Sequence, residues 1–331
     1  KSLLEHYQNG RYDDAEKLAL SITQQFPKHQ FSWTVLGAVL KQTGRINESL
    51  FAKRKAVEIE PLDAQAHYNF GITLQELSRL EEAEASYTQA IALKPDFANA
   101  HYNLGITLNE LGRLDEAEAS YTQAIALKPD YAEAYSNLGN SLQEQGRLDE
   151  AEVSLRQAIA LKPDYAEAHS NLGNSLQELG RLDEAEASYT QAIVLKPDYA
   201  EARYNLGIML QELGRLDEAE ASYTQAIALK PDYAEAHYNL GITLQELGRL
   251  DEAEASYTQA IALKPDYAEA YSNLGNTFQE QGRLEEAEAS YTQAVALKPD
   301  YAEAHNNLGT TLQELGRLDE AEASLRQALA L

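Results

Sequence analysis

Histidine is the residue type in this sequence whose spacing first suggests chemistry, because imidazole is a common metal ligand and proton carrier. Five histidines recur at equivalent positions, separated by 34 residues or a multiple of 34. Equivalent positions of stacked helical repeats lie at least one helix-packing distance, about 9 Å, apart, so these side chains cannot share one ion. We expect no metal site and no cofactor. The five, interpreted as imidazoles packed between helices, are His67, His101, His169, His237 and His305.

Nucleophilic side chains make no better case for catalysis. Serines such as Ser256 recur with every copy of the pattern, whereas a catalytic triad needs one singular convergence of nucleophile and base. The chain has no cysteine, which excludes a thiolate nucleophile, a thiolate metal ligand and a disulfide framework. The sequence therefore predicts no catalytic residues and no enzyme activity for this chain.

Asparagine forms the most informative pattern, one residue in every copy across 64–331. An amide side chain offers both a donor and an acceptor. An extended peptide exposes N–H and C=O groups, which a row of amides can bind without reading side chains. The alternative, equally open from the sequence, is that each amide bonds only to the neighbouring helix. This row, called the asparagine ladder below, comprises Asn69, Asn103, Asn137, Asn171, Asn205, Asn239, Asn273 and Asn307.

Two positions beside the ladder change together. Where Tyr precedes the ladder residue, Ile follows it three residues later; where Ser precedes it, Asn follows, and the last copy has Asn306 with Thr310. Repeated Ile beside Tyr on an otherwise polar stripe suggests a contact surface. The candidate contacts are Tyr68, Tyr102, Tyr204 and Tyr238, with Ile72, Ile106, Ile208 and Ile242, and also Asn140, Asn174 and Asn276.

The elements that must position these residues follow a period of 34. All nine prolines recur at this interval, and all eighteen glycines occupy two positions of the frame, represented by Gly241 and Gly248. Self-similarity at this period indicates a stacked solenoid. Residues 1–63 hold divergent units, the first of them partial. Residues 64–331 hold eight near-identical units, the last lacking its terminal loop.

Each unit is predicted to form two helices, A and B, at about 64–78 and 82–94, repeated every 34 residues with no strand. An Asp followed three residues later by Glu, as at Asp251 and Glu254, is a capping-box pattern and marks the helix starts. Helix A should end where Gly248 or its equivalent supplies a left-handed cap. Helix B should end before the proline, which cannot donate into a helix. The expected fold is therefore all-α, built of helical hairpins.

The buried faces follow from the helical period. A mid-helix glycine such as Gly241 costs roughly 1 kcal/mol relative to alanine, so its recurrence implies close contact between the two helices. Tyr257 and its equivalents lie on the apolar stripe of helix B and are predicted to be core. The row from Tyr131 to Tyr301 is predicted to pack in the joints between units. The asparagine ladder lies on the opposite stripe of helix A, beside acids such as Glu235.

Charge and hydropathy limit the partners. The formal net charge is −26, and residues 1–63 hold nine basic and eight acidic residues, so the excess acid lies in the repeats. Such a surface disfavours nucleic acid, which needs basic groups to neutralise phosphates, and most of these acids are interpreted as a solvated face. The longest apolar run, Val35–Leu40, is far shorter than the ~20 residues of a membrane span. A soluble, cytoplasmic protein with no membrane partner is expected.

The repeat also carries a family resemblance, over practically the whole chain. The residues that carry it are Leu240, Gly241, Gly248, Ala253, Tyr257, Ala260 and Pro265, with His237 where many members have Trp. Their spacing resembles the signature of the tetratricopeptide repeat. The resemblance implies a right-handed superhelical solenoid of helix-turn-helix hairpins in which helix A lines a concave groove.

Two narrower resemblances bear on the ligand. The asparagine ladder resembles that of the superhelical tetratricopeptide arm of O-linked N-acetylglucosamine transferases, which implies a groove that holds polypeptide. Other family members grip the acidic tails of chaperones with Lys and Arg on helix A. Those places here hold the equivalents of Glu235, Tyr238 and Asn239, so acidic chaperone tails are not expected as ligands.

Three functions stay open on this reading. The leading one is a non-enzymatic protein- or peptide-binding scaffold whose groove holds an extended neutral or basic polypeptide. The second is a substrate-recruiting arm of a larger glycosyltransferase-like enzyme whose catalytic domain is absent. The third is a structural spacer that assembles through its ends. Because the chain begins at Lys1 rather than Met, and Leu3, Leu4, Leu329 and Leu331 are expected to be exposed, we expect a fragment with weak end-to-end self-association.

Overall fold

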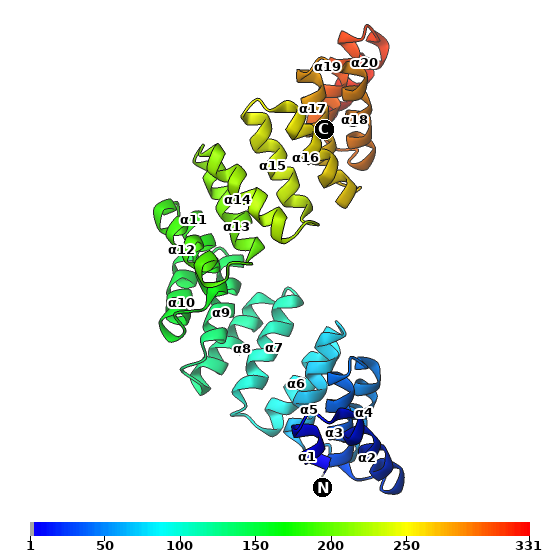
Figure 1. Ribbon diagram of the computed structural model, residues 1–331, viewed down its shortest axis with the longest axis vertical. Coiled ribbons are helices and arrows are strands. Elements are labelled where there is room, and N and C mark those ends of the chain that lie inside the picture. Colours follow the sequence, from blue (N-terminus) through cyan, green and yellow to red (C-terminus); the bar gives the residue numbers. More distant parts are fainter. Residues whose placement is uncertain (1–2) are drawn as a thin grey trace. The chain divides into compact units, whose positions relative to one another are not determined.

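The computed structural model describes residues 3–331, and all of the regular secondary structure in this range is helical, as predicted. The helices pack into two compact units, residues up to Ser175 and Leu176–Leu331, which are treated separately here (Figure 1). The first unit contains α1 (Leu3–Gln8), α2 (Tyr12–Gln25), α3 (Gln30–Gln42), α4 (Ile46–Ile59), α5 (Ala64–Glu76), α6 (Leu80–Leu93), α7 (Ala98–Glu110), α8 (Leu114–Leu127), α9 (Ala132–Glu144) and α10 (Leu148–Leu161).

The boundary between the units falls within α11 (Ala166–Glu178). The second unit then contains α12 (Leu182–Leu195), α13 (Ala200–Glu212), α14 (Leu216–Leu229), α15 (Ala234–Glu246), α16 (Leu250–Leu263), α17 (Ala268–Glu280), α18 (Leu284–Leu297), α19 (Ala302–Glu314) and α20 (Leu318–Ala330). In each 34-residue repeat from α5 onward, helix A is an odd-numbered helix and helix B is the even-numbered helix that follows it. The predicted bounds are correct to within about two residues.

Consecutive helices pair as hairpins within both units. In the first unit α7 packs on α8 and α8 packs on α9; in the second α15 packs on α16 and α16 on α17 (Figure 1). Within each of the two units, A helices of neighbouring repeats also touch, as α5 touches α7 and α15 touches α17. Every hairpin therefore buries its apolar faces against its neighbours, as expected for stacked repeats.

The predicted capping boxes are wrong for the repeating units. Helix α16 begins at Leu250 with Arg249 at its N-cap, so Asp251 lies inside the first turn, and no side chain caps the helix. Helix α15 likewise follows Tyr233 without a side-chain cap. The exception is Asp63, whose carboxylate accepts two backbone N–H bonds from the first turn of α5. Where a helix has acids in its first turn, as α16 has Asp251 and Glu252, they contribute through the helix dipole instead of a cap hydrogen bond.

The two recurrent glycines behave as predicted. Gly248 has a φ of +73°, so it provides the left-handed end of α15. At Gly241 a Cβ atom would lie 2.6 Å from Cε1 of Tyr257, closer than any carbon contact allows. Tyr257 itself is fully buried, and its hydroxyl donates to Oε1 of Gln245 at 3.0 Å. The missing side chain at Gly241 is thus the space that the tyrosine ring fills.

The repeat formed by α5 and α6 has Ser78 where the other repeats have the turn glycine, and this leads to a stability prediction. Ser78, with a φ of +55°, is the non-glycine residue of the described chain in the left-handed region. That conformation costs an L-residue roughly 1–2 kcal/mol, while glycine loses roughly 0.5–1 kcal/mol more conformational entropy on folding. Ser78→Gly should therefore raise the free energy of unfolding by about 0.5–1 kcal/mol in urea denaturation.

Gly112 provides the matched control for Ser78→Gly. It has a φ of +73°, and no atom lies within 4 Å of the position that a Cβ would take. Gly112→Ser changes only the backbone preference and should destabilise by a similar amount. Equal midpoints for wild type and both variants would contradict this account of the turn.

The leucines near the two ends of the sequence differ in exposure. Leu3 was predicted to be exposed but is buried, because it packs with Ala15, Ala19 and Val35 in the core of the first hairpins. Leu4 is 41% exposed and Leu329 is 88% exposed, as predicted. Lys1 lies outside the described residues.

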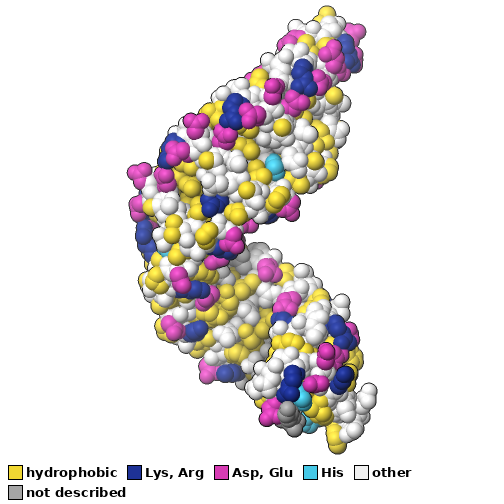
Figure 2. Space-filling model, viewed as in Figure 1, with side chains coloured by type: hydrophobic (Ala, Val, Ile, Leu, Met, Phe, Trp, Pro, Cys, Tyr) yellow, Lys and Arg dark blue, Asp and Glu magenta, His cyan; other side chains and the backbone are white. Residues whose placement is uncertain are grey.

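Ion pairs cover the outer surface along the B helices. Arg249, which directly precedes α16, bonds Glu252 of α16 and Glu220 of α14, both at 2.6 Å. Arg113 repeats this bridge in the first unit, to Glu84 and Glu116. Figure 2 accordingly shows basic and acidic side chains side by side. These arginines are exposed to solvent, so screening by water and salt keeps the contribution of each pair to stability small.

Candidate functional site

The asparagine ladder and the candidate Tyr, Ile and Asn contacts beside it lie on helix A of their repeats and are partly exposed, whereas the serines that precede the ladder residue in three repeats are buried. This stripe is called the ladder face below. Its first-unit part runs over α5, α7, α9 and the start of α11, and its second-unit part over α13, α15, α17 and α19. The helical period keeps Tyr, Asn and Ile of one repeat on the same side of their helix, so the sequence-predicted residues are brought together within each repeat.

Ladder amides bond to the preceding hairpin. In the second unit, Nδ2 of Asn239 donates to the hydroxyl of Tyr204 and Nδ2 of Asn273 to that of Tyr238, both at 3.1 Å. The first unit repeats the bond, from Asn103 to Tyr68 at 3.2 Å and from Asn137 to Tyr102 at 3.1 Å. The bond to the neighbouring helix, one of the two alternatives raised by the sequence, is therefore present. This bond uses one N–H of the amide, which also has a second N–H donor and a carbonyl oxygen.

The tyrosines of the ladder face belong to aromatic triads. The ring of Tyr238 packs against the rings of Tyr257 and Tyr267, with centroid distances of 6.0 and 4.8 Å. Tyr68, Tyr102 and Tyr204 make the same two contacts in their own repeats. Burial raises the pKa of Tyr238 to about 12, so its hydroxyl is neutral and accepts the amide bond at ordinary pH. The sequence predicted the rings as contacts but did not predict that they also join the hairpins.

The remaining candidates are divided between packing and polar roles. Ile242, Ile72 and Ile106 are partly buried and pack against the hydrophobic clusters of their hairpins. Asn276 is already engaged: its Oδ1 accepts from Nδ2 of Asn307 at 3.1 Å and from the hydroxyl of Tyr291 at 2.6 Å. Ile208, Asn140 and Asn174 are partly exposed on the same stripe. The apolar part of the ladder face is thus smaller than the sequence pattern suggests.

Acidic residues border the ladder face. Glu235 and Glu246 are exposed at the two ends of α15. At the carboxyl end, glutamines link neighbouring helices to these acids, as Nε2 of Gln177 does to Glu212 at 2.8 Å. An amide partner does not neutralise a carboxylate, so this border attracts cations and repels anions.

The repeated histidines have a structural partner. Nε2 of His237 lies 3.1 Å from the carbonyl oxygen of Pro231, and the other four repeat this contact. A carbonyl oxygen only accepts, so Nε2 carries the proton. At the same position Trp33 donates to the carbonyl of Pro27 and Arg203 to that of Pro197. The side chain at this position of helix A therefore fixes the loop that contains the preceding proline. Within residues 3–331 no three His, Asp or Glu side chains are grouped as a metal site.

The sequence did not predict a pocket of about 310 Å³ in the first unit, between α1, α3, α4 and α5. Its walls include Asn69 and Ile72 of the ladder face together with Lys53, a lysine that is only 7% exposed. The signal that could have revealed it is that Lys53 stands 34 residues before Tyr87, at a position that is otherwise core.

Comparison with known proteins identifies the repeat. Family models described as tetratricopeptide repeats match residues 54–85, 76–112, 107–146, 139–180, 170–234, 232–300 and 266–331. No curated protein matches the sequence. No described helix combines the length and apolar character needed to cross a membrane.

Solved structures show the same fold. A structure titled as the APC/C hetero-tetramer Cut9-Hcn1 matches 93% of this chain and 60% of its own, at 18% identity and a TM-score of 0.62. PilF of Pseudomonas aeruginosa matches 58% of this chain and 88% of its own, at 20% identity and a TM-score of 0.54. With the family models spanning residues 54–331 and these structures built of the same hairpins, the chain belongs to the tetratricopeptide repeat family.

Proposed function

We propose that the ladder face holds an extended, neutral or basic polypeptide, and that the chain is a non-enzymatic binding scaffold. Membership of the tetratricopeptide repeat family supports the coarser conclusion, a protein-interaction scaffold. The finer proposal rests on the ladder amides. A substrate-recruiting arm of a larger glycosyltransferase-like enzyme would use the same face in the same way.

The observation that carries the proposal is the half-used state of the amides. Asn239 and Asn273 each donate one N–H to a tyrosine of the preceding hairpin, which fixes the plane of the amide. Their carbonyl oxygens accept no hydrogen bond from the described residues, and both side chains are partly exposed. A fixed amide loses little entropy when it binds a second partner. At Asn239 and Asn273 the ladder can therefore offer a carbonyl acceptor to the backbone of a ligand. The carbonyl oxygens of Asn69 and Asn307 already accept hydrogen bonds from neighbouring side chains.

The charge at the border of the ladder face supports a neutral or basic ligand. Exposed carboxylates such as Glu235 and Glu246 flank the amides. At moderate salt the electric field of these carboxylates is screened beyond about 8–10 Å. It therefore acts on a peptide that lies on the ladder face and hardly on one in solution. Affinity for a basic peptide should fall as salt rises, whereas affinity for a neutral peptide of the same length should change little.

Paired substitutions distinguish ligand binding from a purely structural role of the ladder. Asn239→Ala with Asn273→Ala removes two amides, and Tyr204→Phe with Tyr238→Phe removes only their structural acceptors. At roughly 1 kcal/mol per lost hydrogen bond, the Asn pair should weaken binding of a labelled, Lys-containing Gly/Ser 15-mer about 30-fold in fluorescence anisotropy. The Tyr pair should bind within about twofold of wild type. Equal losses of melting temperature in both pairs, with affinity unchanged, would show that the amides only join the hairpins.

A second proposal concerns the last helix. Leu318 and Leu329 of α20 are 64% and 88% exposed, which favours weak self-association through this face. Such contact would serve the alternative of a spacer that assembles through its ends. Sedimentation over a hundredfold range of concentration, with Leu329→Glu as control, decides between a concentration-dependent dimer and a strict monomer.

A further inference from the structure

Lys53 of α4 occupies a core position. The equivalent residue is a buried Tyr in six later repeats and Leu in two, Leu155 and Leu325. Lys53 is only 7% exposed. Its stem fills the space that Gly37 of α3 leaves, since a Cβ there would lie 2.7 Å from Cγ of Lys53. An ammonium group has thus been placed where the other repeats bury an apolar or phenolic side chain, at a cost in desolvation.

The Lys53 ammonium has no counterion in the described part of the chain. Its Nζ donates to the hydroxyl of Thr73 at 2.6 Å, which uses one of three donors. The carboxylate of Glu76 acts on Lys53 electrostatically, but it is ion-paired with Lys41 instead. Burial, followed by repulsion from Lys41, lowers the pKa of Lys53 to about 8, and Glu76 only partly opposes this. The group is still mostly charged at pH 7.

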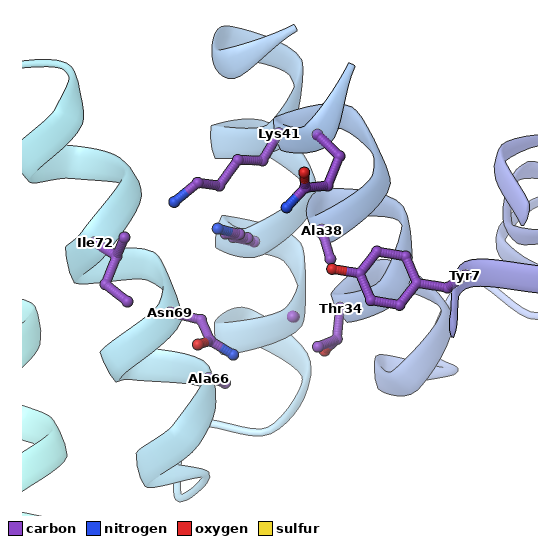
Figure 3. A pocket seen from close by; sticks show the side chains of 10 residues that line it. Tyr7, Thr34, Ala38, Lys41, Ala66, Asn69 and Ile72 are labelled. Carbon is purple, nitrogen blue, oxygen red and sulfur yellow. The ribbon is translucent and has the colours of Figure 1, made fainter. Parts of the chain in front are cut away.

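The Lys53 ammonium borders the pocket between α1, α3, α4 and α5. Figure 3 shows Lys41 and Asn69 extending from α3 and α5 into this space, with the hydroxyl of Tyr7 pointing toward α3 from the other side. At about 310 Å³ the pocket is at the small end of the ~300–1,000 Å³ typical of ligand sites. The polar groups that line it are hydrogen-bond donors or can act as donors: Tyr7, Thr34, Lys41, Gln42, Lys53 and Asn69.

We propose that this pocket binds a small organic acid, whose carboxylate becomes the counterion of Lys53. Lys41 and Lys53 carry two positive charges and Glu76 carries one negative charge, so the site has a net charge of +1. This charge matches that of a monocarboxylate. The carboxylate accepts from the ammonium, and the amide of Asn69 and the hydroxyl of Tyr7, which line the same pocket, are the further donors available to it. The site is independent of the proposed polypeptide binding except for Asn69 and Ile72, which lie in both.

Lys53→Leu tests the proposal, because Leu155 shows that the fold accepts leucine at this position. About 50 mM butyrate should raise the melting temperature of the native chain by about 2–5 °C over equal sodium chloride, and should not do so for Lys53→Leu. The Lys53 ε-nitrogen resonance should shift saturably over the same titration. An equal rise in both proteins, or no shift of that resonance, would overturn the proposal.

A short peptide distinguishes a free acid from a chain terminus. N-acetyl-Gly-Ala-Val is added as its free acid and as its carboxamide. Stabilisation by butyrate and not by the carboxamide supports the proposal, whereas stabilisation by the peptide acid alone would overturn it in favour of a polypeptide carboxyl terminus. The double variant Asn239→Ala with Asn273→Ala changes only the second unit, so it should leave the effect of butyrate intact. Failure of the ladder proposal can therefore be distinguished from failure of this one.

Discussion

Raising the pH from 9 to 11 should unfold the protein, with the second unit losing the most stability, because folding keeps its core tyrosines neutral. Burial is the largest cause that raises the pKa of these phenols well above its usual value near 10. Their contribution is complete below pH 10 and is lost as the pH rises toward the folded pKa. The six fully buried phenols are Tyr87, Tyr121, Tyr189, Tyr223, Tyr257 and Tyr291.

Each raised phenol costs about 1.4 kcal/mol of stability per pH unit above 10. Four of the six lie in the second unit, so at pH 11 that unit loses on the order of 6 kcal/mol, comparable to the stability of a whole domain. Circular dichroism and tyrosinate absorbance should change together in one transition. Tyrosinate absorbance that rises with a midpoint near pH 10 while the helices persist at pH 11 would contradict this expectation.

Tyr257→Ala should give the largest effect of a single substitution, a loss of about 3–5 kcal/mol in urea unfolding. The fully buried ring fills the space at Gly241, packs against Tyr238 and bonds Gln245, so the helices cannot close around the cavity left behind. Tyr257→Leu is the matched control, because Leu155 fills the same position beside its own glycine. The leucine variant should lose less than half as much, and equal losses would show that ring volume is not what holds the hairpin.

The fold was largely predictable from the sequence because one physical unit is repeated. The turn glycine at Gly248, the close contact at Gly241 and the buried ring of Tyr257 each follow from a rule that acts within one or two helical turns. The helix starts were less predictable. Asp251 has the right chemistry for a cap, but Leu250 begins the helix before it. Capping depends on a boundary that is uncertain by one or two residues.

The candidate site was predicted only in outline. The sequence placed Asn239 and Tyr238 on one stripe, but the bond from Asn239 to Tyr204 joins residues 35 apart, and its geometry depends on how hairpins stack. Helical periodicity within one repeat carries no information about that stacking. Lys53 was missed for a related reason. A single basic residue in a divergent unit has no periodic partner, and only its 34-residue alignment with Tyr87 marks it as core.

In the proposed function, the ladder face binds backbone groups of the ligand and is insensitive to its side chains. Modified peptides test this most directly. Three labelled 15-mers are compared by fluorescence anisotropy: a Lys-containing Gly/Ser chain, the same composition in scrambled order, and the first chain with every second backbone nitrogen methylated. The scrambled peptide should bind within about twofold of the first, and methylation should weaken binding at least about 30-fold, since each lost N–H removes roughly 1 kcal/mol. A methylated peptide that binds as well as its parent, with the scrambled one failing, would contradict the central claim.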